Sequence, residues 1–188
     1  GKENLAKQIL ADGSRQGEGA LVVSTGDDAE NVITDYRDRV SGSNNIQFGV
    51  VDCRAEGDSS SESQPGLYVH HVSSPGDLTG IGIGITKCLE SLHGGGADRG
   101  RVALISLSTM LTYTDRETVF KFCHVLSSRL DAAGYIGVFT IDTGAHDEQT
   151  LQVIKQAFDG LVEIRDTDAG REARILGLTD APTAWAAI

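Results

Sequence analysis

Short apolar runs alternate along the chain with segments whose apolar residues recur at helical spacing. The apolar runs are typical of strands buried on both faces, and they cover residues 20–24, 48–53, 67–72, 101–107 and 136–141. The helical segments cover residues 5–13, 78–93, 118–133 and 148–158. This alternation is typical of an α/β domain. We therefore predict a mainly parallel sheet with helices on both faces, and with residues 20–24, 48–52, 101–107 and 136–141 at its centre.

Polar residues and glycines mark the ends of these elements. Asp27 or Asp28 is placed to cap a further helix that runs to about Val40, because Asp accepts the free N–H groups of a first turn. Residues 54–66 are rich in Ser, Glu, Asp and Gly, which predicts a surface loop. A terminal pair of strands is predicted at residues 161–165 and 172–178.

The length fits one domain, residues 1–188, and the charge narrows the choice of partners. The chain has 27 acidic and 16 basic residues, a net charge of −11, and only five lysines against eleven arginines. Such an acidic surface is used by proteins of concentrated salt solutions, and we expect a halophilic origin. No basic stripe is present to neutralise phosphates, so duplex nucleic acid is not an expected direct partner.

Cysteine usage and hydropathy indicate a cytoplasmic protein with reduced thiols. Cys53, Cys88 and Cys123 are widely spaced and odd in number, which disfavours a disulfide framework. No apolar stretch is long enough for a transmembrane helix, and the first residues do not resemble a secretion signal. We therefore expect no membrane partner.

The first residues look like the end of a nucleotide-binding loop. Gly1-Lys2-Glu3-Asn4-Leu5 is similar to the last part of a P-loop, G-x-x-x-x-G-K followed by Ser or Thr, where it enters its helix. In a working P-loop the lysine reaches the outer phosphates and the hydroxyl holds Mg²⁺. A terminal Gly-Lys pair alone is weak evidence, because an ordinary chain start also produces one.

The rest of the chain strengthens that interpretation through a resemblance to a known family. The segments Ala20-Leu-Val-Val-Ser-Thr25, Ser73-Ser-Pro-Gly-Asp-Leu-Thr-Gly80, Ser106-Leu-Ser-Thr-Met-Leu111 and Ala145-His-Asp-Glu-Gln-Thr-Leu151 carry it, together with Lys155-Gln-Ala-Phe-Asp-Gly160. In their order and spacing they resemble the KaiC-like branch of the RecA-type ATPases, specifically an uncharacterised haloarchaeal group. The resemblance implies a RecA-like sheet whose first strand and P-loop start lie upstream of Gly1.

Departures from the family pattern imply a degenerate ATP site. Glu3 matches the hydroxyl position of the P-loop, where a carboxylate repels phosphate. Ile105 matches the Walker B acid, and isoleucine offers no oxygen to a hard cation. The acidic pair that positions attacking water in active relatives matches Asp27 and Asp28, which we keep as weak catalytic candidates, with the helix-cap role favoured. Gly1 and Lys2 remain as cofactor-binding candidates.

Other chemistry-bearing residues form weaker patterns. The five histidines show no metal-ligand spacing, so we predict no metal site. Ser106 and Ser108, with His146 and Asp147 after the next strand, could form a hydrolase triad, but no G-x-S-x-G elbow supports one. Asp142 and His146 follow the carboxyl end of a strand, where open α/β sheets bind ligands.

Two functions therefore compete. The first is a non-catalytic KaiC-like domain that acts through protein contacts as a regulator or scaffold, needs no cofactor, and self-associates as RecA-like domains commonly do. The alternative is a nucleotide-binding sensor or slow ATPase that binds ATP and Mg²⁺.

Overall fold

Six strands form the central sheet. The structure is a computed structural model, and it describes residues 1–43, 45–54 and 60–188. The strands are β1 (Gly19–Ser24), β2 (Phe48–Asp52), β3 (Ser60–Gln64), β4 (Leu67–His71), β5 (Gly100–Ile105) and β6 (Tyr135–Phe139). Their order is β3-β4-β2-β1-β5-β6, and every neighbouring pair is parallel except β3 with β4. The predicted mainly parallel α/β sheet is confirmed.

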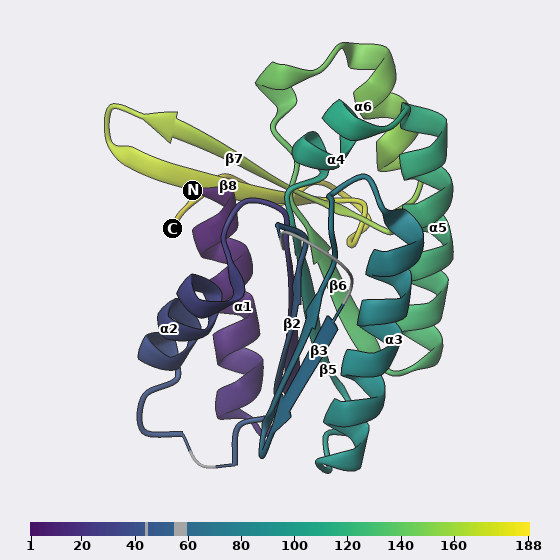
Figure 1. Cartoon of the computed structure of the whole chain (residues 1–188). Coiled ribbons are helices and arrows are strands. Elements are labelled where there is room, and N and C mark those ends of the chain that lie inside the picture. The colour runs from purple at the N-terminus through teal and green to yellow at the C-terminus, as the bar shows by residue number, and fades with distance from the viewer. Residues whose placement is uncertain (44, 55–59) are drawn as a thin grey trace.

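Helices cover both faces of this sheet (Figure 1). One face carries α1 (Lys2–Arg15) and α2 (Ala29–Arg39), which pack with one apolar cluster of strand residues. The other face carries α3 (Leu78–Gly94) and α5 (Arg116–Ala132), which pack with a second cluster. Two shorter helices, α4 (Leu107–Tyr113) and α6 (Glu148–Lys155), complete that second layer. Because β1 and β2 lie between the two layers, every residue of these strands is buried.

Aspartate side chains begin four of the helices. Asp28, Asp77, Asp115 and Asp147 each accept a hydrogen bond from a backbone N–H group in the first turn of α2, α3, α5 and α6. These bonds satisfy donors that a helix leaves unpaired at its start. Of the two candidates for the cap of α2, Asp28 holds the position.

The predicted surface loop at 54–66 is partly wrong. Residues 60–64 form β3, which pairs antiparallel with β4, while residues 55–59 lie outside the described part. All five residues of β3 are exposed. Backbone pairing and the polar contacts of Ser61 with His70 and of Glu62 with His71 hold this strand against β4. An exposed edge strand of this kind needs no apolar alternation, so its sequence resembles a loop.

Two predicted strands also differ from the structure. The strand expected at 101–107 ends at Ile105, and Leu107 already begins α4, because Leu107 is as apolar in a helix as in a strand. The strand expected at the centre, 136–141, is β6; it ends at Phe139 and lies at the edge of the sheet. Apolar content alone does not distinguish an edge strand from a central one.

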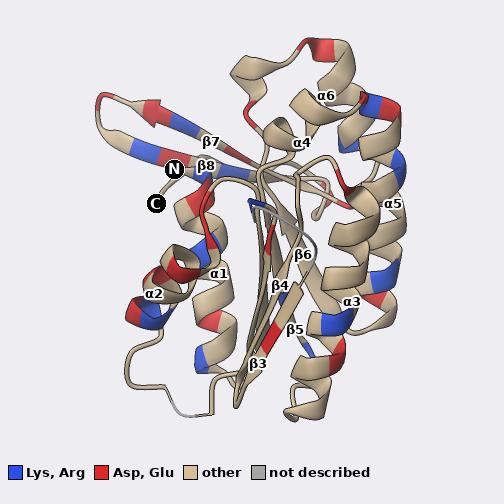
Figure 2. Ribbon diagram, viewed as in Figure 1, with Lys and Arg blue, Asp and Glu red and all other residues tan. Residues whose placement is uncertain are grey.

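The C-terminal strands form a separate sheet. It contains β7 (Leu161–Thr167), β8 (Gly170–Leu176) and the short β9 (Ala186–Ala187), in that order. Acidic and basic residues alternate along the β7–β8 hairpin (Figure 2). The guanidinium carbons of Arg165 and Arg174 lie 4.1 and 4.7 Å from the centre of the Trp185 ring. Among the described helices, none has the length and apolar character that crossing a membrane requires.

Candidate functional site

The sequence candidates converge at the carboxyl edge of the sheet. A hollow of about 320 Å³ opens there between the start of α1, the ends of β1 and β5, and the segment after β6. We call it the central hollow. It is lined by Lys2, Glu3, Thr25, Gly26, Asp27, Ile105, Ser106, Ser108, Thr109, Asp142 and Ala145. This is the edge at which parallel α/β sheets bind ligands.

Four of the six candidate residues lie in this hollow, and two do not. Lys2, Glu3, Asp27 and Ile105 line it, although up to 103 positions separate them in the chain. Gly1 precedes the first turn of α1 and is not among the lining residues. Asp28 is directed into α2, where its carboxylate accepts hydrogen bonds from the backbone and side-chain nitrogens of Asn31.

The lining of the central hollow contains three acidic side chains and one basic side chain. Lys2 is its one basic residue, against the carboxylates of Glu3, Asp27 and Asp142. The Lys2 Nζ atom lies 3.8 Å from Asp142 Oδ2, and both side chains are well exposed, so solvent weakens this pair. A polyphosphate would therefore have to displace Asp142 and approach two further negative charges.

Glu3 places a negative charge at the start of α1. It lies in the first turn of α1, whose preceding residue, Gly1, makes no side-chain cap. A negative charge in the first turn interacts favourably with the helix dipole and the unpaired N–H groups. In a P-loop helix that position interacts with phosphate instead. A carboxylate at this position interacts favourably with the helix start but disfavours a phosphate there.

Ile105 offers no oxygen to a metal ion. The residue is buried at the end of β5, and its backbone carbonyl already accepts hydrogen bonds from Thr25 N at 2.7 Å and Thr25 Oγ1 at 2.8 Å. The hydroxyl of Thr25 also accepts a hydrogen bond from Ser106 N at 2.8 Å. Thr25 therefore ties the ends of β1 and β5 together. Mg²⁺ requires oxygen ligands in octahedral geometry, and Ile105, which the sequence resemblance aligns with the Walker B acid, has no side-chain oxygen.

Asp27 is held by a lysine from α1. Lys7 Nζ lies 3.8 Å from Asp27 Oδ2 and 3.0 Å from Asp35 Oδ2, and the Lys7 side chain is only 16% exposed. At Asp35, burial raises the pKa, but hydrogen bonds from Arg39 and Lys7 outweigh it and leave the pKa lowered. Lys7 thus links α1 to α2 and to the loop after β1, an arrangement that gives Asp27 a structural partner.

Ser108 and His146 meet across two elements. His146 Nε2 and Ser108 Oγ lie 2.9 Å apart, and the same hydroxyl accepts a hydrogen bond from Asp142 N at 2.8 Å. A hydrolase triad would need a carboxylate behind the imidazole. Asp147 caps α6 instead, and the ion pairs of histidine among the described residues involve His71 and His93. The contact therefore orders the segment after β6 against α4.

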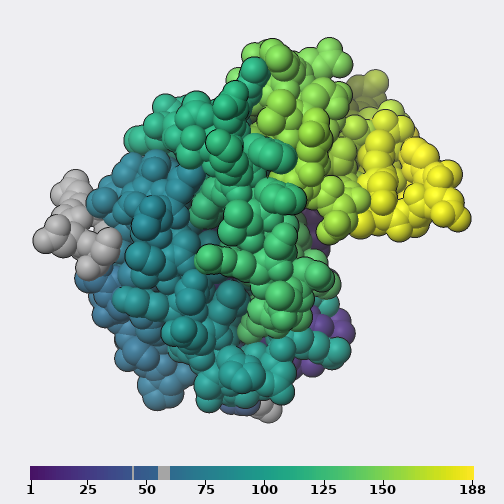
Figure 3. All heavy atoms as spheres, turned by 90° about the vertical axis from the view of Figure 1, so that its right-hand side faces the viewer, coloured from purple at the N-terminus to yellow at the C-terminus, as the bar shows by residue number. Residues whose placement is uncertain are grey.

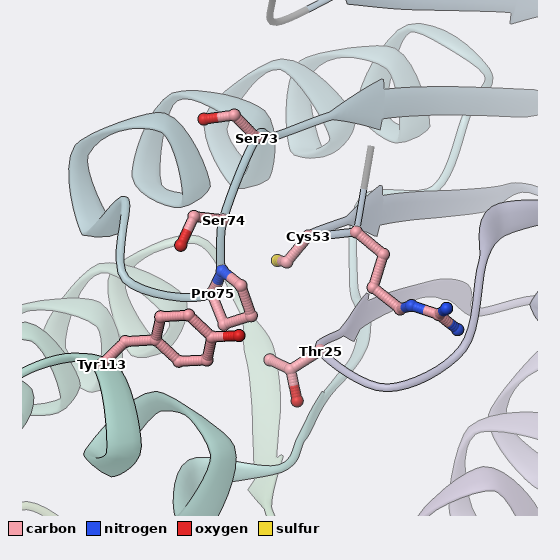
Figure 4. A pocket seen from close by; sticks show the side chains of 7 residues that line it. Thr25, Cys53, Ser73, Ser74, Pro75 and Tyr113 are labelled. Atoms are coloured by element: carbon pink, nitrogen blue, oxygen red, sulfur yellow. The ribbon is translucent and has the colours of Figure 1, made fainter. Parts of the chain in front are cut away.

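A second hollow, of about 300 Å³, adjoins the first and shares Thr25 with it (Figure 4). Its lining is Thr25, Cys53, Arg54, Ser73, Ser74, Pro75 and Tyr113. We call it the Tyr113 hollow. The Tyr113 ring lies beside Pro75, and the side chain is 61% exposed. Burial raises the pKa of the Cys53 thiol to about 12, so the thiol stays protonated at neutral pH and is a poor nucleophile.

Sequence reasoning missed Thr25 and Tyr113 as lining residues. Thr25 directly follows β1, so its position after a buried strand was a usable signal. Tyr113 had no such signal in the sequence, because it is the last residue of α4, and this helix was not predicted. Within the described ranges, His, Cys, Asp and Glu form no group that could hold a metal ion.

The strand order, the two helical layers and the position of the hollow define a mainly parallel α/β domain with a candidate site at the carboxyl edge of its sheet. The chain belongs to DUF7504, described as a family of unknown function, whose sequence profile matches residues 1–164. No match is found among curated proteins.

Solved structures share this fold at low sequence identity. An uncharacterised protein from Pyrococcus horikoshii, crystallised in complex with an unknown peptide, has a TM-score of 0.61 at 12% identity, over 94% of this chain and 78% of that one. A KaiC-like protein from the same archaeon has a TM-score of 0.55 at 12% identity, over 94% of this chain and 72% of that one. At this identity the likeness concerns the fold.

Proposed function

We propose that this chain is a KaiC-like domain that does not hydrolyse ATP and acts through contacts with other proteins, as a regulator or scaffold. The composition of the central hollow carries the proposal. Phosphoryl transfer needs the metal, the lysine and a water-orienting group held together. Here the two positions that match the metal anchors hold Glu3 and Ile105, and Asp27 is paired with Lys7.

A role in protein contacts has one supporting observation outside this chain. The P. horikoshii protein of similar fold holds a peptide in its crystal structure. A fold of this kind can therefore present a surface to another polypeptide, and this use needs none of the catalytic groups that the central hollow lacks.

Lys2 favours a second candidate, a nucleotide sensor. Its ammonium group lines the central hollow beside the start of α1, and the volume of about 320 Å³ is within the range of small-molecule sites. A nucleotide bound without Mg²⁺ would need only the lysine and the first-turn N–H groups. Calorimetric titration of ATP, with and without Mg²⁺ in about molar KCl, separates the candidates, because only the sensor binds.

We expect phosphate release from Mg-ATP to stay at the level of a protein-free blank. Loss of a metal anchor removes several kcal/mol of transition-state stabilisation, and each 1.36 kcal/mol is about tenfold in rate. The measurement compares the unmodified chain with Lys2→Ala and with the double variant Glu3→Thr, Ile105→Asp. Glu3→Gln serves as the matched control, since it removes the charge without supplying a hydroxyl. Turnover in the unmodified chain that disappears in Lys2→Ala would show a divergent ATPase instead.

A further inference from the structure

The Tyr113 hollow has an aromatic wall and polar edges that include no acid. The Tyr113 ring lies beside Pro75, and Figure 4 shows its hydroxyl pointing across the hollow toward Thr25. The Cys53 thiol lies at the floor, where the residue is fully buried. The described residues that line this hollow include no carboxylate and no amide side chain. An exposed aromatic ring beside a hollow is typical of surfaces that bind another molecule.

Local contacts hold the aromatic wall in position. A Cβ atom added at Gly76 would lie 2.9 Å from the Tyr113 Cβ atom, so the turn before α3 and the last residue of α4 are in direct contact. Gly76 N also donates a hydrogen bond to Ser74 Oγ at 3.1 Å, which orders the turn that carries Pro75. Because these walls are already ordered, a ligand that binds between them loses little affinity to their rearrangement.

The polar side chains around the hollow are mainly hydrogen-bond donors. Ser74 Oγ already accepts the bond from Gly76, which leaves its O–H group to donate. Arg54 Nη1 donates to Gly26 O at 2.7 Å, and a guanidinium group has further N–H donors and no acceptor. The Tyr113 hydroxyl points into the hollow from the opposite wall. A ligand suited to this lining therefore has several acceptors and few donors.

The charges near the hollow favour a neutral ligand. Burial is the largest cause of the raised pKa of the Cys53 thiol, and the negative charges of Asp52 and Asp77 add to it. The field of these two carboxylates thus reaches the floor of the hollow, where it opposes the single positive charge of Arg54. The net charge of −11 repels an acidic ligand as a whole.

The C-terminal strands leave this hollow uncovered. None of the described residues of β7, β8 or β9 lines it. In Figure 3 the C-terminal segment, in yellow, stands out from the side of the molecule opposite the blue segment that carries β4. A ligand can therefore approach the turn after β4 without displacing these strands.

We propose that the Tyr113 hollow binds a proline-containing, extended segment of a partner protein. This inference rests on the proposed function, because it names the kind of segment through which such a partner is recognised. Proline has a carbonyl acceptor but no N–H group, so the segment brings acceptors to a lining of donors and leaves few donors unpaired. Its rings pack against the exposed aromatic ring, as in other grooves that bind the polyproline II conformation. This conformation exists before binding, which reduces the entropy lost.

The test begins with a display library of peptides of about seven residues that carry two prolines three positions apart. This spacing places both prolines on the same side of a polyproline II helix, which has three residues per turn. A second library with alanine at the same two positions is selected on the unmodified chain in parallel. We expect enrichment from the proline library alone. The enriched sequences are then synthesised with capped ends and titrated by calorimetry.

Variants of the aromatic wall assign the binding to this hollow. Tyr113→Ala should weaken the binding of an enriched peptide by at least about tenfold, while the melting temperature changes little, because alanine keeps the Cβ atom that contacts Gly76. Tyr113→Phe keeps the ring and removes one donor, and we expect about a fivefold loss. Val125→Ala is the matched control, since Val125 is also exposed but lies on α5 outside both hollows. It should leave the affinity unchanged.

The salt dependence separates a neutral ligand from an acidic one. The affinity for a capped, uncharged peptide should change by less than about twofold between about 0.1 M and 1 M KCl, whereas a carboxylate held by Arg54 would be screened. No enrichment from the proline library, unchanged binding by Tyr113→Ala, or binding that requires an acidic residue would each overturn the inference. If proline-free peptides bind equally to the unmodified chain and to Tyr113→Ala, protein contacts stay supported and only this site is wrong. Phosphate release from Mg-ATP tests the proposed function separately.

Discussion

Neighbouring aspartates of the same local sequence perform different tasks. Asp28 accepts hydrogen bonds from Asn31 and begins α2, while the carboxylate of Asp27 turns toward Lys7. Residue type and position in the chain are nearly identical for the two. The backbone direction at the start of α2 decides which side chain can reach the free N–H groups.

This difference predicts unequal effects on stability. Asp28→Ala should lower the free energy of unfolding by about 1 kcal/mol, because it removes the cap of α2. Asp27→Ala should change it by less than about 0.5 kcal/mol, because the pair with Lys7 is partly screened by solvent. Urea denaturation of both variants measures the difference. A larger loss for Asp27→Ala than for Asp28→Ala would contradict the assignment of the capping role to Asp28.

At the scale of elements, the junction of β1, β5 and α4 shapes the site. The Thr25 side chain is buried and bonds to the backbone on both sides of the Ile105–Ser106 peptide. It thereby sets where β5 ends and where α4 begins. Since α4 carries Ser108, Thr109 and Tyr113, this junction determines the walls of both hollows.

Thr25→Val should therefore destabilise the protein more than an ordinary conservative change. Valine keeps the shape but removes the hydroxyl, which leaves the partly buried Ser106 N–H without its partner, and we expect a loss of about 1–3 kcal/mol. Thr25→Ser keeps the hydroxyl and is the matched control, with an expected loss of about 1 kcal/mol for one buried methyl group. Thermal or urea denaturation compares the two. Equal losses would show that the methyl group, not the hydroxyl, is the important part.

At the scale of the whole molecule, repulsion between acidic side chains opposes folding. The net charge is −11, and acidic residues occur in both helical layers and in the C-terminal hairpin (Figure 2). Compaction brings these charges closer than they are in the unfolded chain, so the folded state bears more of the cost. Dissolved salt screens this repulsion over distances set by the Debye length.

We expect the melting temperature to rise from low salt to about molar KCl. Most of the increase should occur below about 1 M, because the Debye length there is already only about 3 Å. Thermal melts at a series of KCl concentrations measure it. A melting temperature that stays flat or falls would contradict an adaptation to concentrated salt.

The sequence by itself determined the elements that are buried and periodic. The apolar runs of β1, β2 and β5 and the spaced apolar residues of α3 and α5 indicated their type, because burial on both faces leaves a continuous apolar run and burial on one face leaves a periodic one. The resemblance of short motifs predicted a RecA-like sheet, and the alignment of Glu3 and Ile105 with the family's metal anchors stays a prediction from that resemblance.

Tertiary structure alone decided the features that depend on neighbours. β3 is a strand only because β4 lies beside it, and β6 is an edge only because of the order of pairing. The central hollow joins Lys2, Asp27 and Ile105 from three distant parts of the chain. The pairing of Asp27 with Lys7 likewise required the packing of α1 on α2. Such contacts follow from the arrangement of elements in space, and local sequence carries no record of them because each partner is compatible with many others.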